Sequence, residues 1–409
     1  MFLSTERRRS PWLAVTGVVA VYFAFGLAIG LMPPMVDEIR ADLDLSRSAM
    51  GSILGAWALI YVLTAVPGGA MVERLGLRRA MLLGGLSVAL SMLLRSLATG
   101  GVTLFLAVAV FGIGGPLVSI STPKLVASLF AEDARRLPTG LGVAAPGLGS
   151  AVGFALPNPV LLPLFEGSWR AVLGLGAAVA GLAGVYWWWA TRHSLHRAPP
   201  AEPMRPGTLA RLLRLSSMRW ILGISLFSFA FGHGLNGWLP EILAEAGLGD
   251  AAAGYVAGAS TLVGILGALT IARSIPARWR ARALVGVYLV LGLGALGLGT
   301  QPPAGVVASA VIIGFARAGT VPLMFLEIMD DDDIAIADVG AATGLFFAVA
   351  EIGGFAGPWG VGVLADRGDG FTGAIVGLTV VCAGAAAGAI GLATTRVRGR
   401  RPSPTVASP

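Results

Sequence analysis

Twelve long apolar segments follow one another along this chain, and they constrain its fold more than any other feature. A helix needs about 20 residues to cross the roughly 30 Å hydrocarbon core of a bilayer. Runs of about this length lie at residues 11–34, 49–71, 79–99, 102–129, 138–163, 169–190, 218–242, 252–274, 282–299, 304–327, 340–364 and 371–394. The sequence therefore predicts an all-α integral membrane protein with twelve transmembrane helices.

The composition excludes the other broad classes of protein. Of the 409 residues, 56% are hydrophobic and only 12% are charged, whereas a soluble domain carries about a quarter charged residues. This excludes a soluble enzyme and a disordered chain. The single cysteine, Cys382, rules out an intramolecular disulfide framework and a cysteine-based zinc cluster. No phosphate-binding loop ends in Gly-Lys-Ser/Thr, so ATP-driven pumping has no support, and we expect no cofactor or metal.

The positive charge indicates membrane topology rather than nucleic-acid binding. The net charge of +7 comes from arginines in alternate segments between the apolar runs, at positions 7–9, 74, 78, 79, 135, 136, 273, 278, 280, 282, 396, 398, 400 and 401. Cytoplasmic loops are enriched in such residues, so both termini are expected in the cytoplasm. The acidic run Asp330–Asp333 lies on the same side and departs from this trend.

The chain repeats itself at an offset of about 203–206 residues. Phe23-Ala24-Phe25-Gly26 returns as Phe229-Ala230-Phe231-Gly232, and Thr139-Gly140-Leu141 returns as Thr343-Gly344-Leu345. In the same register Gly149 and Gly153 correspond to Gly353 and Gly357, and Pro123 corresponds approximately to Pro322. The repeat predicts two pseudo-symmetric six-helix bundles, a common plan among transporters. We place them at residues 1–190 and 218–409, joined by a cytoplasmic linker at residues 191–217.

The segment between the second and third apolar runs carries a spaced motif of glycines, an acid and arginines. Its residues are Gly69, Glu73, Arg74, Gly76, Arg78 and Arg79. The motif resembles the signature of the major facilitator superfamily of transporters, and the repeat and the twelve runs extend the resemblance to the whole chain. The resemblance implies alternating access between two bundles, with this motif as a cytoplasmic gate. The equivalent segment of the second half, residues 268–278, is degenerate.

Three further segments resemble the bacterial cyanate-permease-like and nitrate/nitrite-porter-like branch of that superfamily. They are Gly237–Leu243, Pro123–Val126 and Glu351–Pro358. This resemblance implies a monomeric, multi-pass protein of the bacterial inner (plasma) membrane that moves a small, anionic solute, with protons as coupling partners. An arginine that many members carry early in the fourth helix is missing here, since residues 106–111 contain none.

Two ionisable residues lie near the middle of predicted helices, where a charge is costly enough to require a reason. Arg317 lies about thirteen residues into the tenth run. Its guanidinium could bind a planar anion through two parallel hydrogen bonds, or form a structural ion pair with Glu351. Glu351 lies halfway along the eleventh run. It could carry a proton, or hydrogen-bond to Arg317 or to the backbone without titrating.

His233 lies in the middle of the seventh run, which the family resemblance places beside the substrate path. A histidine there could relay protons or bind an anion, or it could bond to a neighbouring helix. Asn236 and Trp238 follow it and could supply a hydrogen bond and an aromatic ring to the substrate.

Three other features permit a structural interpretation as well as a functional one. Lys124, the only lysine, could draw substrate toward the cytoplasm or extend to lipid headgroups. Arg95 is expected to anchor the outer end of its helix at the membrane surface. Trp187, Trp188 and Trp189 are expected to form an aromatic belt at the lipid interface.

Three functions remain open from the sequence. The leading hypothesis is a secondary transporter for a small anion, with Arg317 as the anion-binding group and with His233 and Glu351 as pH-sensitive partners. The second is an exporter of hydrophobic cations or drugs that are recognised by Glu351. The third is a non-transporting membrane receptor, which the intact gate motif disfavours.

Overall fold

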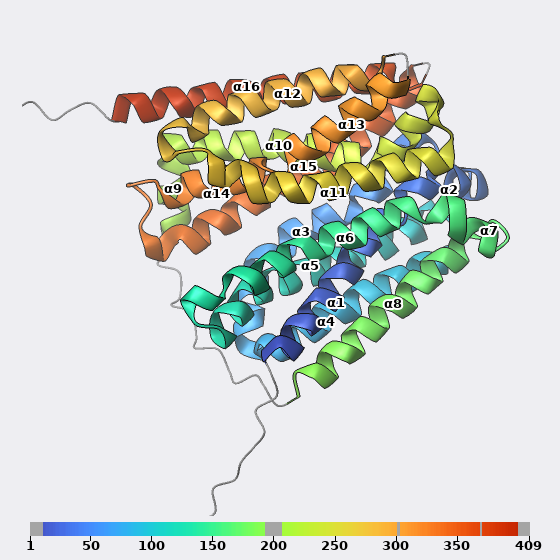
Figure 1. Ribbon diagram of the computed structural model, residues 1–409, viewed down its shortest axis with the longest axis horizontal. Helices are drawn as coiled ribbons and strands as arrows, with labels where there is room; N and C mark the ends of the chain where they lie inside the picture. The colour runs from blue at the N-terminus through green and yellow to red at the C-terminus, as the bar shows by residue number, and fades with distance from the viewer. Residues whose placement is uncertain (1–10, 193–206, 301–302, 369, 400–409) are drawn as a thin grey trace, which may run out of the picture.

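A computed structural model describes residues 11–192, 207–300, 303–368 and 370–399. Throughout these ranges the regular structure is helical and no β-strand occurs (Figure 1). The helices of the first half are α1 (Pro11–Gly30), α2 (Val36–Leu43), α3 (Arg47–Leu75), α4 (Leu77–Ser96), α5 (Gly101–Leu129), α6 (Arg136–Ala155), α7 (Leu162–Leu164) and α8 (Trp169–Ala190). Those of the second half are α9 (Thr208–Arg214), α10 (Ser216–Leu243), α11 (Asp250–Ser274), α12 (Arg280–Leu298), α13 (Pro303–Arg317), α14 (Thr320–Met329), α15 (Val339–Arg367) and α16 (Thr372–Gly399).

The predicted membrane fold is confirmed. Among the described residues, ten helical segments are long and apolar enough to cross a bilayer, and two bent helix pairs raise the number to as many as twelve. One bend, of 48°, separates α6 from the short segment Pro157–Leu164, within the predicted fifth span. The other, of 87°, separates α9 from α10, where the predicted linker meets the second half.

The tenth predicted helix is not continuous. It ends as α13 at Arg317 and resumes as α14 at Thr320. Pro322 explains the interruption, because a proline inside a helix has no N–H to donate and its ring clashes with the carbonyl four residues earlier. The Thr320 hydroxyl donates to the carbonyl of Arg317 at 2.8 Å and so satisfies one of the freed groups. The guanidinium-bearing residue therefore stands at a helix end rather than on a continuous helix face.

The internal repeat corresponds to repeated packing. In the first half α6 packs against α1, and in the second half α15 packs against α10. Gly149 lies against the backbone of Phe23, and Gly353 lies against the backbone of Leu226, so closely that a Cβ at either glycine would clash. Small residues allow membrane helices this close approach. The matching glycines thus hold equivalent helix pairs in two six-helix bundles, which occupy the lower and upper parts of Figure 1.

The acidic segment after α14 is neutralised by arginines from three other helices. Asp330 pairs with Arg280 of α12, Asp331 pairs with Arg396 of α16, and Asp338 pairs with Arg211 of α9. The acids that depart from the predicted charge pattern therefore fasten this loop to its arginine-rich neighbours.

The two halves meet mainly where α3 contacts α15 and where α6 contacts α11. Figure 1 shows the halves converging toward the end that carries α2, which is the predicted extracellular side, and separating toward the end where α1 begins and α16 finishes. At the converging end Gly51 of α3 lies against the backbone of Pro358 of α15.

Charged contacts reinforce this closed end. The Asp366 carboxylate accepts hydrogen bonds from the backbone N–H groups of Arg47 at 2.9 Å and Ser48 at 2.7 Å, and so caps α3 from the opposite half. The Glu241 carboxylate accepts from Arg47 Nε at 2.9 Å and lies 3.5 Å from Arg40 Nη1. We call Arg40, Arg47, Glu241 and Asp366 the outer lock.

The outer lock predicts that Asp366→Ala shifts the protein toward a state that is open at this end. Losing a capping carboxylate costs about 1 kcal/mol, or roughly fivefold in the equilibrium. Spin labels at Leu164→Cys and Ala304→Cys, in a Cys382→Ser background, would report the distance between the two halves by double electron–electron resonance. We expect the population with the longer distance to grow.

Asp42→Ala is the matched control for this experiment. Asp42 pairs with Arg170 at 2.6 Å, but both residues belong to the first half. Its loss should leave the distance distribution unchanged. If Asp366→Ala and Asp42→Ala give the same distribution, the contact across the two halves does not hold the outer end closed.

Candidate substrate cavity

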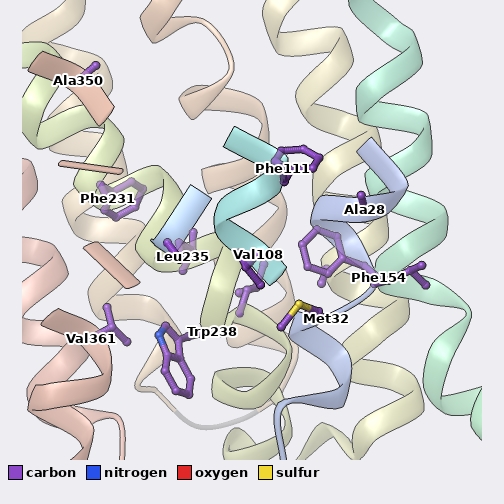
Figure 2. Close-up of a cluster of buried hydrophobic side chains, with 14 of the residues drawn as sticks. Ala28, Met32, Val108, Phe111, Phe154, Phe231, Leu235, Trp238, Ala350 and Val361 are labelled. Carbon is purple, nitrogen blue, oxygen red and sulfur yellow. The ribbon is translucent and has the colours of Figure 1, made fainter. Parts of the chain in front are cut away.

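A cavity lies between the two halves, on the inner side of the outer lock. It contains about 620 Å³ of empty space, part of it open to solvent. Its lining from the first half includes Ala28, Met32, Leu54, Trp57, Arg95, Val108 and Phe111. Its lining from the second half includes His233, Asn236, Gly237 and Pro358. Figure 2 shows Ala28, Met32, Val108 and Phe111 gathered on one side, so much of this wall is apolar.

Four residues of the second half form a polar cluster beside the cavity. Two of them, His233 and Asn236, line the cavity, and the other two reach it only through these neighbours. Arg317, at the end of α13, donates from Nη2 to Asn236 Oδ1 of α10 at 3.2 Å. His233 Nδ1 of α10 lies 3.7 Å from Glu351 Oε2 of α15. We call Arg317, Asn236, His233 and Glu351 the polar cluster. Four of the residues singled out from the sequence are thus brought together by three helices and a helix break.

The cluster does not contain the ion pair that was one interpretation of Arg317. Within the described part of the chain, no carboxylate lies within ion-pairing distance of Arg317, and the ionic neighbour of Glu351 is His233. The Arg317 Nε atom is buried without a hydrogen-bond partner. The guanidinium therefore retains donor capacity that no described residue uses.

His233 also connects the two halves through aromatic contacts. Its ring centroid lies 5.0 Å from that of Trp57 in α3 and 5.3 Å from that of Phe229 in its own helix. Because Trp57 belongs to the first half, a change in the charge or position of His233 would alter a contact at the interface between the halves.

Trp238 does not contact the cavity, contrary to the expected role in substrate binding. Its side chain is fully buried, its indole Nε1 donates to the Pro358 carbonyl at 2.9 Å, and its ring packs against Phe371. Trp238 lies two positions after Asn236 and therefore projects from another side of α10, where it packs against α15. We assign Trp238 a packing role.

Lys124 lies away from the polar cluster and contacts the gate motif. Its Nζ atom lies 3.2 Å from Glu73 Oε1, which ties α5 to α3 within the first half. Both side chains are partly exposed, and such pairs contribute little to stability. Lys124 is absent from the cavity lining, so the contact with Glu73 is the role that its position supports.

The rest of the gate motif forms a turn held by α8. Gly76 has a positive φ of 78°, which favours glycine, and Arg74 and Arg79 are exposed. The Arg78 guanidinium stacks on Trp188 at 3.5 Å and donates to its carbonyl, while Trp187 donates to the carbonyl of Arg78 at 2.9 Å. Trp187 is fully buried, so the expected aromatic belt is wrong for this residue. Gly69 lies within α3, and its surroundings are outside the described contacts.

Arg95 does not lie at the membrane surface, where the sequence predicts it, since its side chain is buried and lines the cavity. Side chains in a helix point back toward its N-terminus, so an arginine near the outer, C-terminal end of α4 points toward the middle of the membrane. The contact with the Ala28 carbonyl shows that it also lies on the side of α4 that faces α1. The direction along the helix follows from the sequence, but the side of the helix does not.

Comparison with known proteins places this geometry in a family. The family model described as Major Facilitator Superfamily matches residues 18–358. The chain is 27% identical over 375 residues to the Bacillus subtilis protein called uncharacterized transporter YycB, covering 88% of each chain. It is 25% identical over 316 residues to the 2-nitroimidazole transporter of Escherichia coli, covering 76% of this chain and 77% of the relative. It is 23% identical over 341 residues to the gallate transporter of Pseudomonas putida, covering 75% and 74% respectively.

A solved structure agrees with the fold. The bacterial homolog of the human lysosomal transporter Spinster, in an inward-facing and unoccupied conformation, superposes with a TM-score of 0.76. The alignment covers 98% of this chain and 100% of that one at 14% sequence identity, so it bears on the fold alone. The matched family model, the transporter relatives and this fold agree: the chain is a membrane transporter that belongs to the major facilitator superfamily.

Proposed function

We propose that this protein is a secondary active transporter that moves a small anion across the membrane by alternating access. The observation that carries the proposal is the Arg317 guanidinium, which lies in the polar cluster without a carboxylate partner in the described structure. A cation near the middle of a bilayer costs about 3 kcal/mol on insertion scales, so an unpaired one indicates a function. A substrate carboxylate or similar planar anion would supply the missing acceptor.

The relatives support a small planar substrate. One is named for gallate, which is an aromatic carboxylate, and another for 2-nitroimidazole, which is a planar ring compound. The cavity fits such molecules because Trp57 and Phe111 present aromatic surface beside Asn236. We do not propose drug export through Glu351, since this buried carboxylate already has His233 as an ionic neighbour, whereas Arg317 has no ionic partner in the described structure.

The outer lock supports an inward-facing state for this structure, with the arginine-rich end facing the cytoplasm. In this inward-facing arrangement of the two halves, substrate would be released toward the arginine-rich end. Transport would then require the contacts of α3 with α15 to break at the outer end while the opposite ends approach. The two bundles provide the rigid bodies for such a motion, and residues 193–206 of the predicted linker lie outside the described residues.

We further propose that Glu351 and His233 couple transport to protons. Burial disfavours the charged form of a carboxylate, so Glu351 can exchange a proton when the cavity opens to water. The 3.7 Å separation between Glu351 and His233 allows the proton on one group to change the charge felt by the other. Because the His233 ring packs against Trp57 of the first half, that change in charge would alter a contact between the two halves.

The role of Arg317 predicts that Arg317→Gln abolishes most uptake. Hydrogen bonds to a charged group contribute about 1.5–3 kcal/mol, so the substrate should bind at least tenfold more weakly. The measurement is uptake of radiolabelled gallate and benzoate into proteoliposomes. Arg280→Gln, which removes a guanidinium paired with Asp330 outside the cavity, is the control and should retain uptake within about twofold. Undiminished uptake by Arg317→Gln would contradict the proposal.

The role of Glu351 predicts that Glu351→Gln uncouples proton movement from substrate movement. The variant should still exchange substrate for substrate, but a pH-sensitive dye inside the vesicles should record no substrate-driven proton flux. Glu327→Gln is the matched control, since Glu327 is a buried acid of the same half that pairs with Arg396 at 3.0 Å. Proton flux that persists in Glu351→Gln at the control level would eliminate Glu351 as the carrier.

A further inference from the structure

Arg95 presents a guanidinium to the cavity, from the half opposite the polar cluster. Only 3% of the residue is exposed. Its Nε donates to the Ser91 hydroxyl at 3.2 Å, and its Nη1 donates to the Ala28 carbonyl at 2.9 Å and lies 3.5 Å from the sulfur of Met32. These contacts orient the guanidinium between α1 and α4.

The third nitrogen of this guanidinium remains available. Arg95 Nη2 makes no hydrogen bond within the described structure, yet it is not among the sealed polar atoms that lack a partner. Described carboxylates also lie beyond ion-pairing distance of Arg95. Because Arg95 lines the cavity and its other two nitrogens are engaged, we assign Nη2 as the atom available to a ligand there.

Apolar residues make up much of the cavity lining. Leu54, Trp57 and Phe111 line the same cavity as Arg95 and Asn236, and Asn236 is the hydrogen-bond partner of Arg317. Trp57 and Phe111 pack edge to face with centroids 5.6 Å apart, and both residues contribute aromatic surface to the lining. A ligand that reached from Arg95 to Asn236 would therefore need an apolar body with an acceptor group at each end, and a planar aromatic ring is a body that packs well against Trp57 and Phe111.

We propose that Arg95 is an anion-binding residue of the cavity, and that the substrate is a planar molecule with two anionic or acceptor groups. One group binds Arg95 in the first half and the other binds Arg317 and Asn236 in the second half. This inference rests on the proposed function for its substrate path. It adds a residue and a substrate shape that the polar cluster alone does not specify, and it gives the ligand a contact with each half.

The test compares two probes that differ by one carboxylate. Benzoate carries one, and terephthalate carries a second at the opposite end of the same ring. Dissociation constants for both are measured by calorimetry on the purified full-length protein, and the ratio of the benzoate constant to the terephthalate constant is the readout. We expect the wild type to bind terephthalate at least tenfold more tightly.

Variants of Arg95 test whether this residue causes the preference for terephthalate. Arg95→Met keeps the bulk of the side chain without its charge, and should bring the ratio to within about twofold of one. Arg95→Lys keeps the charge but loses the planar fork, and should give an intermediate ratio. Arg170→Met removes a guanidinium from the same end of the same half, where it is held by Asp42 outside the cavity, and should keep the wild-type ratio.

The outcomes separate binding from structure. A purely structural Arg95 would lower the melting temperature of the variants and leave the ratio at its wild-type value, which would overturn the proposal. A wild-type ratio near one, or no binding of either probe, would also overturn it. If Arg95→Met does not fold, Arg95→Lys decides by the same criterion.

Arg317→Gln distinguishes this inference from the proposed function. This variant should weaken the binding of both benzoate and terephthalate. If it weakens the binding of neither, while Arg95→Met still removes the preference for terephthalate, the proposed role of Arg317 is wrong and that of Arg95 is supported.

Discussion

The constraint on which the rest of this structure depends is a guanidinium that is removed from bulk water and has no carboxylate partner. The protein holds two of them, Arg95 in the cavity lining and Arg317 beside Asn236, while Glu351 lies beside His233. In a low-dielectric interior such charges are tolerated only with hydrogen-bond partners or with access to a polar cavity. Carbonyl, hydroxyl and amide oxygens accept some of the hydrogen bonds that the two guanidiniums can donate. A negatively charged solute would accept the remaining ones.

Helix direction and helix interruption bring the two arginines to this position. Arg95 is near the C-terminal end of α4 and Arg317 is the last residue of α13, so both side chains point back along their helices into the protein. Glycine packing of α6 on α1 and of α15 on α10 keeps each bundle rigid. The outer lock then closes the converging end, so the cavity is bounded by the same two bundles that must move to release its contents.

Much of the fold was predictable from the sequence, since the length and spacing of apolar runs determine helix number and the repeat determines the two-bundle plan. The break before Thr320 is not visible in the apolar run 304–327, because Pro322 interrupts the helix without lowering the hydrophobicity of the segment. In the site, Arg317, His233, Asn236 and Glu351 were predictable because charge and polarity are conspicuous in apolar runs. Trp238 and Arg95 were placed wrongly because each depends on the direction of a side chain about its helix, which spacing to the nearest loop does not give.

The central claim is that the cavity recognises negative charge, and a pair of isosteric ligands tests it most directly. Benzoate and benzamide have the same ring and nearly the same shape, but only benzoate is an anion. Calorimetric titration of the purified protein with each should show benzoate binding at least tenfold more tightly, because only the carboxylate gives the arginines a charged acceptor. Equal affinity for the two compounds would contradict the account.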